Sequence, residues 1–131
     1  FSIGTNDLTQ YTLAMDRDHP RLASQADSFH PSVLRLIART VQAAHAHGKW
    51  VGVCGALASE TLAVPLLLGL GVDELSVSVP LIPAIKARVR ELDLSECQAL
   101  AARIIDLEDA VQVRECLQRQ QVAADSLVLE N

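Results

Sequence analysis

The chain has 131 residues, which suffices for one hydrophobic core and leaves no room for a second. Half of the residues are hydrophobic and only 3% are aromatic, so we expect a folded, aliphatic interior and exclude intrinsic disorder. With 11 Lys and Arg against 16 Asp and Glu, the formal net charge is -5, which argues against a nucleic-acid partner.

The first elements form a strand, a short helix and a loop. Residues 1–3 are a short apolar run that the turn-forming residues at 4–7 end, as is typical of a buried strand. A short helix is predicted through Met15, with Asp7 in a capping-box-like position at its start. The polar segment 16–30 is interpreted as a long loop, and loops of that length are usually functional.

The clearest helix begins at Pro31, where apolar residues recur every three or four positions up to Gly48. The continuous apolar run 50–54 predicts a strand buried on both faces. Pro65 lies inside the next helical pattern, which either kinks there or begins near Thr61. The remaining predictions are helices at 59–70, 80–92, 95–106 and 108–119 and a third strand at 74–78.

Strands that alternate with helices predict right-handed crossovers and a parallel sheet. A (β/α)8 barrel needs about 250 residues. The expected fold class is therefore α/β, the C-terminal portion of a TIM barrel with about three parallel strands, whose missing strands would precede Phe1. A compact three-layer α/β domain is the alternative. We expect residues 1–131 to form one partial domain, with 120–131 as a tail of no assigned structure.

Membrane insertion is not expected, because the longest nearly uncharged stretch, 62–72, is shorter than the roughly 20 apolar residues that a transmembrane helix needs. Three cysteines without a C-x-x-C spacing indicate a reducing compartment, so the cytoplasm is the expected location.

Ligands bind at the carboxyl ends of parallel strands in both architectures, and three such ends are predicted, at 4–7, 54–56 and 76–78. At the first end, Asp7 has the carboxylate that Mg²⁺ prefers, although it could instead cap a helix. Asn6 could donate its side-chain amide to an anionic substrate or merely form a turn.

Two further residues are candidates. Arg17 could make a forked contact with phosphate or carboxylate, but a surface arginine between two aspartates is more often a solvated ion-pair member. Cys54, at the end of the second strand, could act as an acid or a nucleophile, but an isolated cysteine is more often a small buried hydrophobic residue. The chain has no Walker loop, no G-x-G-x-x-G and no H-E-x-x-H motif.

Four ordered segments carry a family resemblance. FSIGTNDLTQYTLAMDR at 1–17 resembles the signature of the phosphoenolpyruvate-utilising enzymes, specifically Enzyme I of the bacterial sugar phosphotransferase system. HPSVLRLI, HGKWVGVCG and LLLGLGVDELSVS resemble successive stretches of the same barrel, over about residues 1–90. Pyruvate phosphate dikinases share the GTNDLTQ segment, but their sequences usually differ from this one directly after it. Enzyme I usually has Glu after the Cys-Gly pair, whereas Ala56 stands here, which resembles the fructose-type multiphosphoryl transfer proteins.

This resemblance implies a (β/α)8 barrel that takes the phosphoryl group of phosphoenolpyruvate with Mg²⁺, leaving pyruvate. The group would pass through a phosphohistidine on a separate N-terminal domain to the phosphocarrier protein HPr or an HPr-like domain. By resemblance, Asp7 is the metal ligand, Asn6 and Arg17 contact phosphate, and Cys54 is the acid that protonates the enolate carbon. The resemblance also implies a homodimer.

Several parts of the family's site, including the phosphohistidine, would precede Phe1, so the fragment alone is expected to be inactive. Three alternatives stay open. The chain could be a dimerisation or assembly module without its own catalysis, a pyruvate phosphate dikinase-like phosphoenolpyruvate domain, or a small α/β binding domain.

Overall fold

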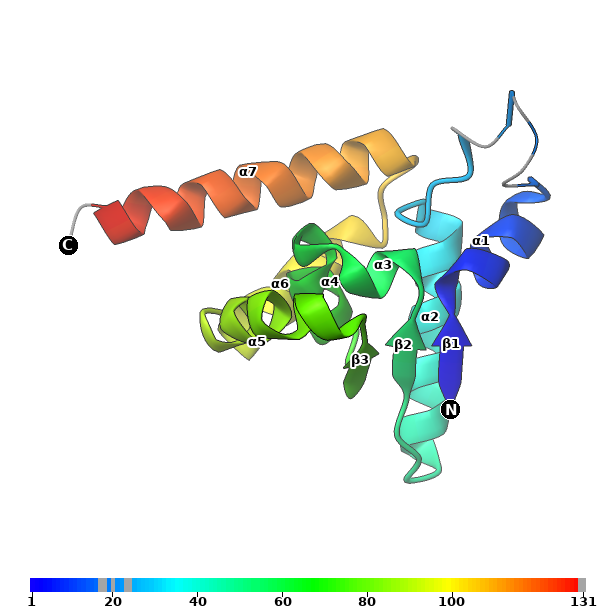
Figure 1. Cartoon of the computed structure of the whole chain (residues 1–131), viewed down its shortest axis with the longest axis horizontal. Helices are drawn as coiled ribbons and strands as arrows, with labels where there is room; N and C mark the ends of the chain where they lie inside the picture. Colours follow the sequence, from blue (N-terminus) through cyan, green and yellow to red (C-terminus); the bar gives the residue numbers. More distant parts are fainter. Residues whose placement is uncertain (17–18, 20, 23–24, 130–131) are drawn as a thin grey trace.

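A computed structural model describes residues 1–16, 19, 21–22 and 25–129, with the side chains of 124–129 excepted. Within this part of the chain, a small parallel sheet contains β1 (Ser2–Gly4), β2 (Gly52–Cys54) and β3 (Glu74–Ser76), in that order. Figure 1 shows the arrowheads of β1 and β2 pointing the same way. The parallel α/β arrangement predicted from the sequence is confirmed.

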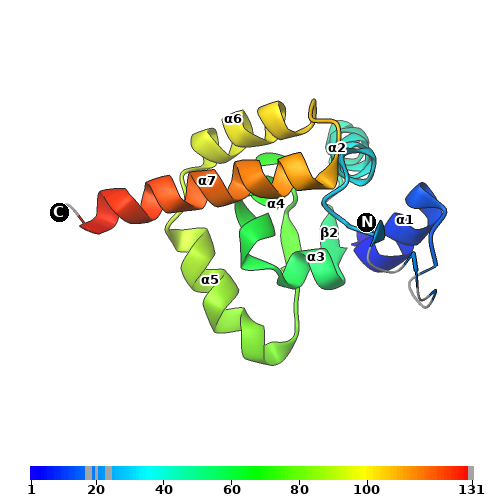
Figure 2. The same cartoon turned by 90° about the horizontal axis from the view of Figure 1, so that it is seen from above.

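Helices connect the strands and follow the last of them (Figures 1 and 2). In chain order they are α1 (Thr5–Leu13), α2 (Pro31–Ala46), α3 (Ala56–Ser59), the 3-10 turn η2 (Thr61–Ala63), α4 (Val64–Gly69), the 3-10 turn η3 (Val79–Leu81), α5 (Ile82–Arg90), α6 (Leu94–Ile104) and α7 (Ala110–Leu129). No helix in the described ranges is both long and apolar enough to cross a membrane.

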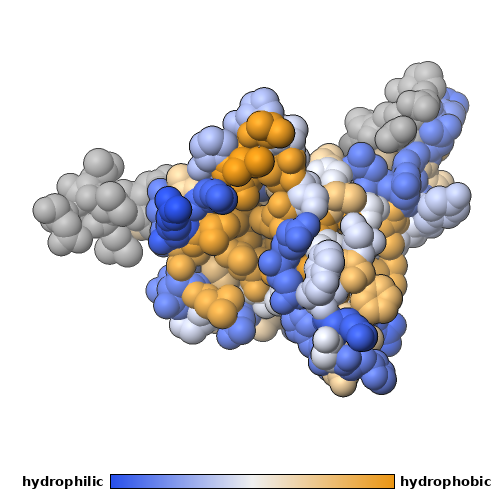
Figure 3. Space-filling model, turned by 60° about the horizontal axis from the view of Figure 1, so that its bottom comes forward, coloured by the Kyte–Doolittle hydropathy of each residue, from blue (hydrophilic) through white to orange (hydrophobic). Residues whose placement is uncertain are grey.

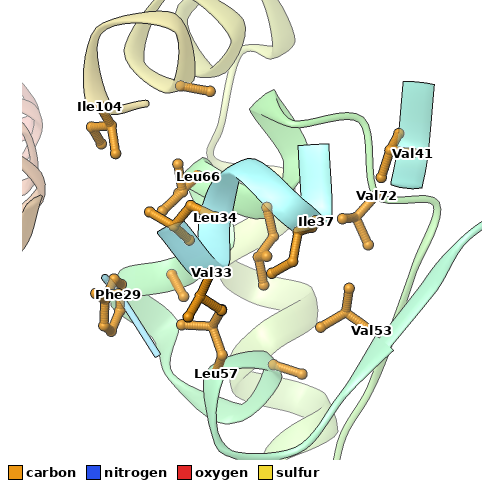
Figure 4. Packing of buried hydrophobic residues seen from close by; sticks show 14 of the residues in the cluster. Phe29, Val33, Leu34, Ile37, Val41, Val53, Leu57, Leu66, Val72 and Ile104 are labelled. Atoms are coloured by element: carbon orange, nitrogen blue, oxygen red, sulfur yellow. The ribbon is translucent and has the colours of Figure 1, made fainter. Parts of the chain in front are cut away.

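The core lies between one face of the sheet and the helices (Figure 4). Val53 of β2 is fully buried in this core, and its register partners Ile3 and Leu75 pack against it. Buried side chains from the helices complete it, among them Val33, Leu34, Ile37, Leu66, Leu100, Ile104 and Leu117. Since alternate residues of a strand face opposite sides, Cys54 and its neighbours in register lie on the other face of the sheet.

The best-predicted helix, α2, follows the sequence signals closely. Pro31 occupies its first turn, and the Nδ1 atom of His30 accepts a hydrogen bond of 3.2 Å from the Ser32 N–H. Just beyond its end, Gly48 has a φ of 64°, the left-handed conformation that glycine adopts without strain.

Three local predictions are wrong. The segment 59–70 is not one helix, because Pro65 lacks an N–H and instead occupies the first turn of a separate helix, α4. Asp7 does not cap α1, because the capping position is Gly4, three residues before Asp7, and Asp7 lies within the first turn of the helix. The last helix does not end at Arg119 as predicted, since α7 continues to Leu129.

Candidate functional site

Two hydrogen bonds join the turns that follow β1 and β2. The Thr5 hydroxyl donates to the Cys54 carbonyl oxygen at 2.8 Å, and the Ala56 N–H donates to Asn6 Oδ1 at 2.9 Å. Thr5 is fully buried, so its hydroxyl bond is shielded from competing water. The two strand-to-helix turns therefore form one structural unit.

Gly55 allows this close approach. Its φ of 94° lies in the region that side chains rarely adopt, and a Cβ on this residue would stand 2.6 Å from Thr5 Oγ1 and 3.0 Å from Asn6 Oδ1. Any larger residue would push the two turns apart. In the sequence, Gly55 is only the residue that follows the second predicted strand, and the polar Thr5 directly after the first strand is the signal that could have indicated its partner.

Asn6 uses its side-chain oxygen for a structural hydrogen bond and leaves its side-chain nitrogen available to donate to a ligand. Its Oδ1 is engaged by the Ala56 N–H, so its amide nitrogen keeps two hydrogens for another acceptor. The residue is half-buried in the first turn of α1. The turn role and the expected contact with an anionic substrate are therefore compatible within one side chain.

Asp7 is exposed in the first turn of α1 and lines a shallow hollow with Gln10, Tyr11, Met15 and Asp16. A carboxylate at this end of a helix is stabilised by the helix dipole. Across the described residues, no three His, Cys, Asp or Glu side chains are grouped to hold a metal ion. Mg²⁺ can nevertheless be held by one or two carboxylates together with substrate oxygens and water, so Asp7 fits as one ligand.

Cys54 is the last residue of β2, half-buried, and it carries a free thiol. The other two cysteines, Cys97 and Cys116, are also unpaired. Cys97 differs from Cys54 in its surroundings, because it is buried in α6 and this burial raises the pKa of its thiol. Cys54 is thus the cysteine that stands at the strand ends.

The predicted site residues Asn6, Asp7 and Cys54 all lie on the two turns joined by the Thr5 and Asn6 bonds. Arg17, the fourth predicted residue, lies outside the residues that the structure describes. The third strand end contributes Ser76, which is exposed and pairs in register with Cys54.

Comparison with known proteins agrees with this arrangement. The family model described as "PEP-utilising enzyme, PEP-binding domain" matches residues 1–94. The chain is 56% identical over 114 residues to a multiphosphoryl transfer protein of Xanthomonas campestris, covering 87% of the chain and 14% of that protein. It is 47% identical over 117 residues to multiphosphoryl transfer protein 1 of Escherichia coli K12, covering 89% of the chain and 14% of that protein.

The chain also matches a phosphoenolpyruvate-protein phosphotransferase of Haemophilus influenzae, with 43% identity over 118 residues that cover 90% of the chain and 20% of that protein. It therefore spans a small part of the length of these relatives. The matched residues include both turns of the candidate site. The chain belongs to the PEP-utilising enzymes, where PEP is phosphoenolpyruvate, and residues 1–94 correspond to their PEP-binding domain.

Proposed function

We propose that the chain is the C-terminal part of a (β/α)8 barrel that binds PEP in a PEP-dependent protein phosphotransferase. The observation that carries this proposal is the Asn6–Ala56 hydrogen bond, which holds Asn6, Asp7 and Cys54 on two adjoining turns at the carboxyl ends of parallel strands. Substrates of barrel enzymes bind at this end of the strands. The relatives' names supply the reaction class.

Each side chain has a distinct task in this proposal. The Asp7 carboxylate would hold Mg²⁺, which when bound supplies positive charge for the phosphate and enolate oxygens. The free amide hydrogens of Asn6, together with Arg17, would bind the phosphate oxygens. Cleavage of the bond between phosphorus and the enol oxygen transfers the phosphoryl group to a histidine elsewhere in the protein and leaves the enolate of pyruvate. Cys54 would then give its S–H proton to the terminal carbon, forming pyruvate.

The barrel is supported by the distribution of residues on the sheet. Successive strands are neighbours, and the core covers one face, while the opposite face carries small or polar residues such as Gly4, Cys54 and Ser76. Beside β1 lies an apolar hollow lined by Phe1, Leu36 and other residues. Further strands of a barrel would cover such a surface and pair with the exposed edges of β1 and β3.

The parent protein is proposed to use Mg²⁺ and HPr or an HPr-like domain, to form a homodimer, and to reside in the cytoplasm, where free cysteines such as these persist. Exposed hydrophobic side chains on η3 and α5, among them Val79, Ile82 and Val89, favour assembly. Figure 3 shows apolar surface gathered in a broad patch on one face of the molecule. The identities of 56% and 47% to multiphosphoryl transfer proteins, against 43% to the Haemophilus phosphotransferase, favour that branch.

Titration calorimetry on the full-length parent tests the function. We expect PEP binding that depends on Mg²⁺ and that Asp7→Ala weakens strongly. Asp106→Ala, which removes an exposed carboxylate from the turn between α6 and α7, should leave binding unchanged. Equal PEP binding by the parent and Asp7→Ala would favour a pure assembly role for this segment.

A further inference from the structure

Arg114 on α7 contacts three side chains that lie on the segments following α1 and α3. Its Nε and Nη2 atoms donate to the two carboxylate oxygens of Asp27, at 2.7 and 3.0 Å. Its Nη1 atom donates to Glu60 Oε2 at 3.3 Å, and its guanidinium carbon lies 4.2 Å from the centre of the Phe29 ring. One planar group thus contacts three residues from two distant segments of the chain.

The geometry of this cluster requires an arginine. Only a guanidinium can form a two-pronged contact with a carboxylate while its flat face rests on an aromatic ring. Phe29 is fully buried, which places the stacked contact against the core. The hydrogen bonds with Asp27 raise the pKa of Arg114, so it stays charged at every physiological pH. Phe29 lies in the segment 16–30 that was predicted as a polar loop, and the sequence alone indicated no role for Arg114.

From Asp27, the adjacent residue Ser28 and the hydrogen bonds that follow it lead to the first turn of the site. Asp27 Oδ1 accepts from the Phe29 N–H at 2.9 Å, which shapes the chain around Ser28. Ser28 Oγ lies 2.9 Å from Thr9 Oγ1, and the Thr9 hydroxyl donates to the Thr5 carbonyl oxygen at 2.7 Å. Thr5 in turn binds the Cys54 carbonyl oxygen at 2.8 Å.

From Glu60, a second route leads to the other turn. Glu60 directly follows α3, and α3 begins at Ala56, whose N–H binds Asn6. Arg114 therefore binds a residue that follows each turn along the chain: Asp27 in the segment after α1, and Glu60 directly after α3. Figure 1 shows α7 crossing at the end of the molecule toward which β1 and β2 point. Arg114 nevertheless lies beyond residues 1–94, which the family model matches.

We propose that Arg114 is a positioning residue for the PEP site, which holds the two turns bearing Asn6 and Cys54 at the spacing that proton transfer to the enolate requires. This inference rests on the proposed function. Arg114 does not touch the substrate in this proposal. Its loss should therefore lower kcat more than it raises KM, because small misplacements of reacting groups are costly to rate.

The test compares three variants of the full-length parent well below their melting temperatures. Arg114→Gln should lower kcat at least about tenfold with a smaller change in KM for PEP. Arg114→Lys should fail to restore the rate, because an ammonium group cannot make the fork. Arg119→Gln is the matched control on the same helix, since Arg119 is exposed and, among the described residues, its Nε donates to the Glu115 carbonyl within α7.

Amide hydrogen exchange gives a readout that does not depend on activity. In Arg114→Gln, but not in Arg119→Gln, exchange should accelerate at residues 5–9 and 54–57. Unchanged kcat, full rescue by Lys, or faster exchange confined to α7 would each overturn the positioning role. If the unmodified parent itself fails to bind PEP, the proposed function is wrong, and the exchange experiment still decides whether Arg114 holds the two turns.

Discussion

The side-chain oxygen of Asn6 accepts a hydrogen bond of 2.9 Å from the backbone N–H of Ala56, which lies 50 positions further along the chain. Because the donor is a backbone group, this bond does not depend on the side chain at position 56. Having Ala56 where Enzyme I usually has glutamate therefore leaves the connection between the two turns in place. Any effect of alanine in place of glutamate at position 56 therefore has to come from the side chain itself and not from the hydrogen bond between the turns.

Asn6→Asp separates the two roles of Asn6. The new carboxylate can still accept from the Ala56 N–H, but it has no amide hydrogens to donate and it repels phosphate. We expect a melting temperature close to that of the parent and PEP affinity reduced at least about tenfold, since hydrogen bonds to charged groups are worth about 1.5–3 kcal/mol. Asn6→Ala is the comparison, because it should lose both stability and affinity. Calorimetric titration and thermal unfolding measure the two effects, and unchanged affinity of Asn6→Asp would remove the substrate role.

Cys54→Ala removes the proposed proton donor. We expect pyruvate formation in the full-length parent to fall by about 10²–10⁴-fold, the usual contribution of general acid catalysis, while Mg²⁺ binding and folding persist. Cys116→Ala, at a half-buried position on α7, serves as the control and should keep the rate of the parent. The measurement is a coupled assay of pyruvate release. Turnover by Cys54→Ala at the parent's rate would show that another group supplies the proton.

Gly69→Ala should destabilise the domain even though alanine favours helices by about 1 kcal/mol over glycine. A Cβ on Gly69 would overlap the backbone carbonyl of Cys97 and stand 2.8 Å from Ala101 Cβ, where α4 crosses α6. Neither helix can move without disturbing the core. Overpacking of this kind costs about 1–3 kcal/mol or more, measurable by denaturant unfolding. Gly48→Ala is the comparison, because a Cβ there meets nothing within 4 Å and only the left-handed backbone is strained.

Asp73 is expected to make the free energy of unfolding depend on pH in the acidic range. Its Oδ2 atom lies 2.8 Å from His45 Nε2 and accepts from the Val51 N–H at 2.7 Å, and these bonds hold the pKa of Asp73 below its ordinary value. A carboxyl whose pKa is lower in the folded state stabilises the fold above its unfolded pKa, and this stability is lost as pH falls through the folded value.

Asp73→Asn should therefore lower the melting temperature at neutral pH and flatten its decline in acid. Thermal unfolding between about pH 6 and 3 measures this change, since carboxyl groups titrate in that range. Asp106→Asn, at an exposed position, should keep the pH profile of the parent. Parallel profiles for the parent and Asp73→Asn would contradict the prediction.

Local sequence was sufficient to predict the three strands, their parallel arrangement and helix α2. Short apolar runs indicated the strands, and apolar residues at every third or fourth position indicated α2, with glycine or proline at the ends of these elements. Such signals are contained within a few neighbouring positions. Local sequence was not sufficient over 59–70, where helical composition favoured one helix but Pro65 begins a separate helix, α4. It was also not sufficient for α7, which continues beyond the predicted end at Arg119. Motif order in residues 1–17 was enough to indicate the family that the comparison confirms.

The sequence by itself determined which residue types stand after each strand: an amide and a carboxylate after the first, and a thiol at the end of the second. Only the tertiary structure decided that Asn6 Oδ1 accepts a hydrogen bond from the Ala56 N–H and that Gly55 must lack a side chain. It also decided that Arg114 binds Asp27, which lies 87 positions away in the chain. Contacts over such separations depend on how whole elements pack against the core, and no local pattern of residues records that packing.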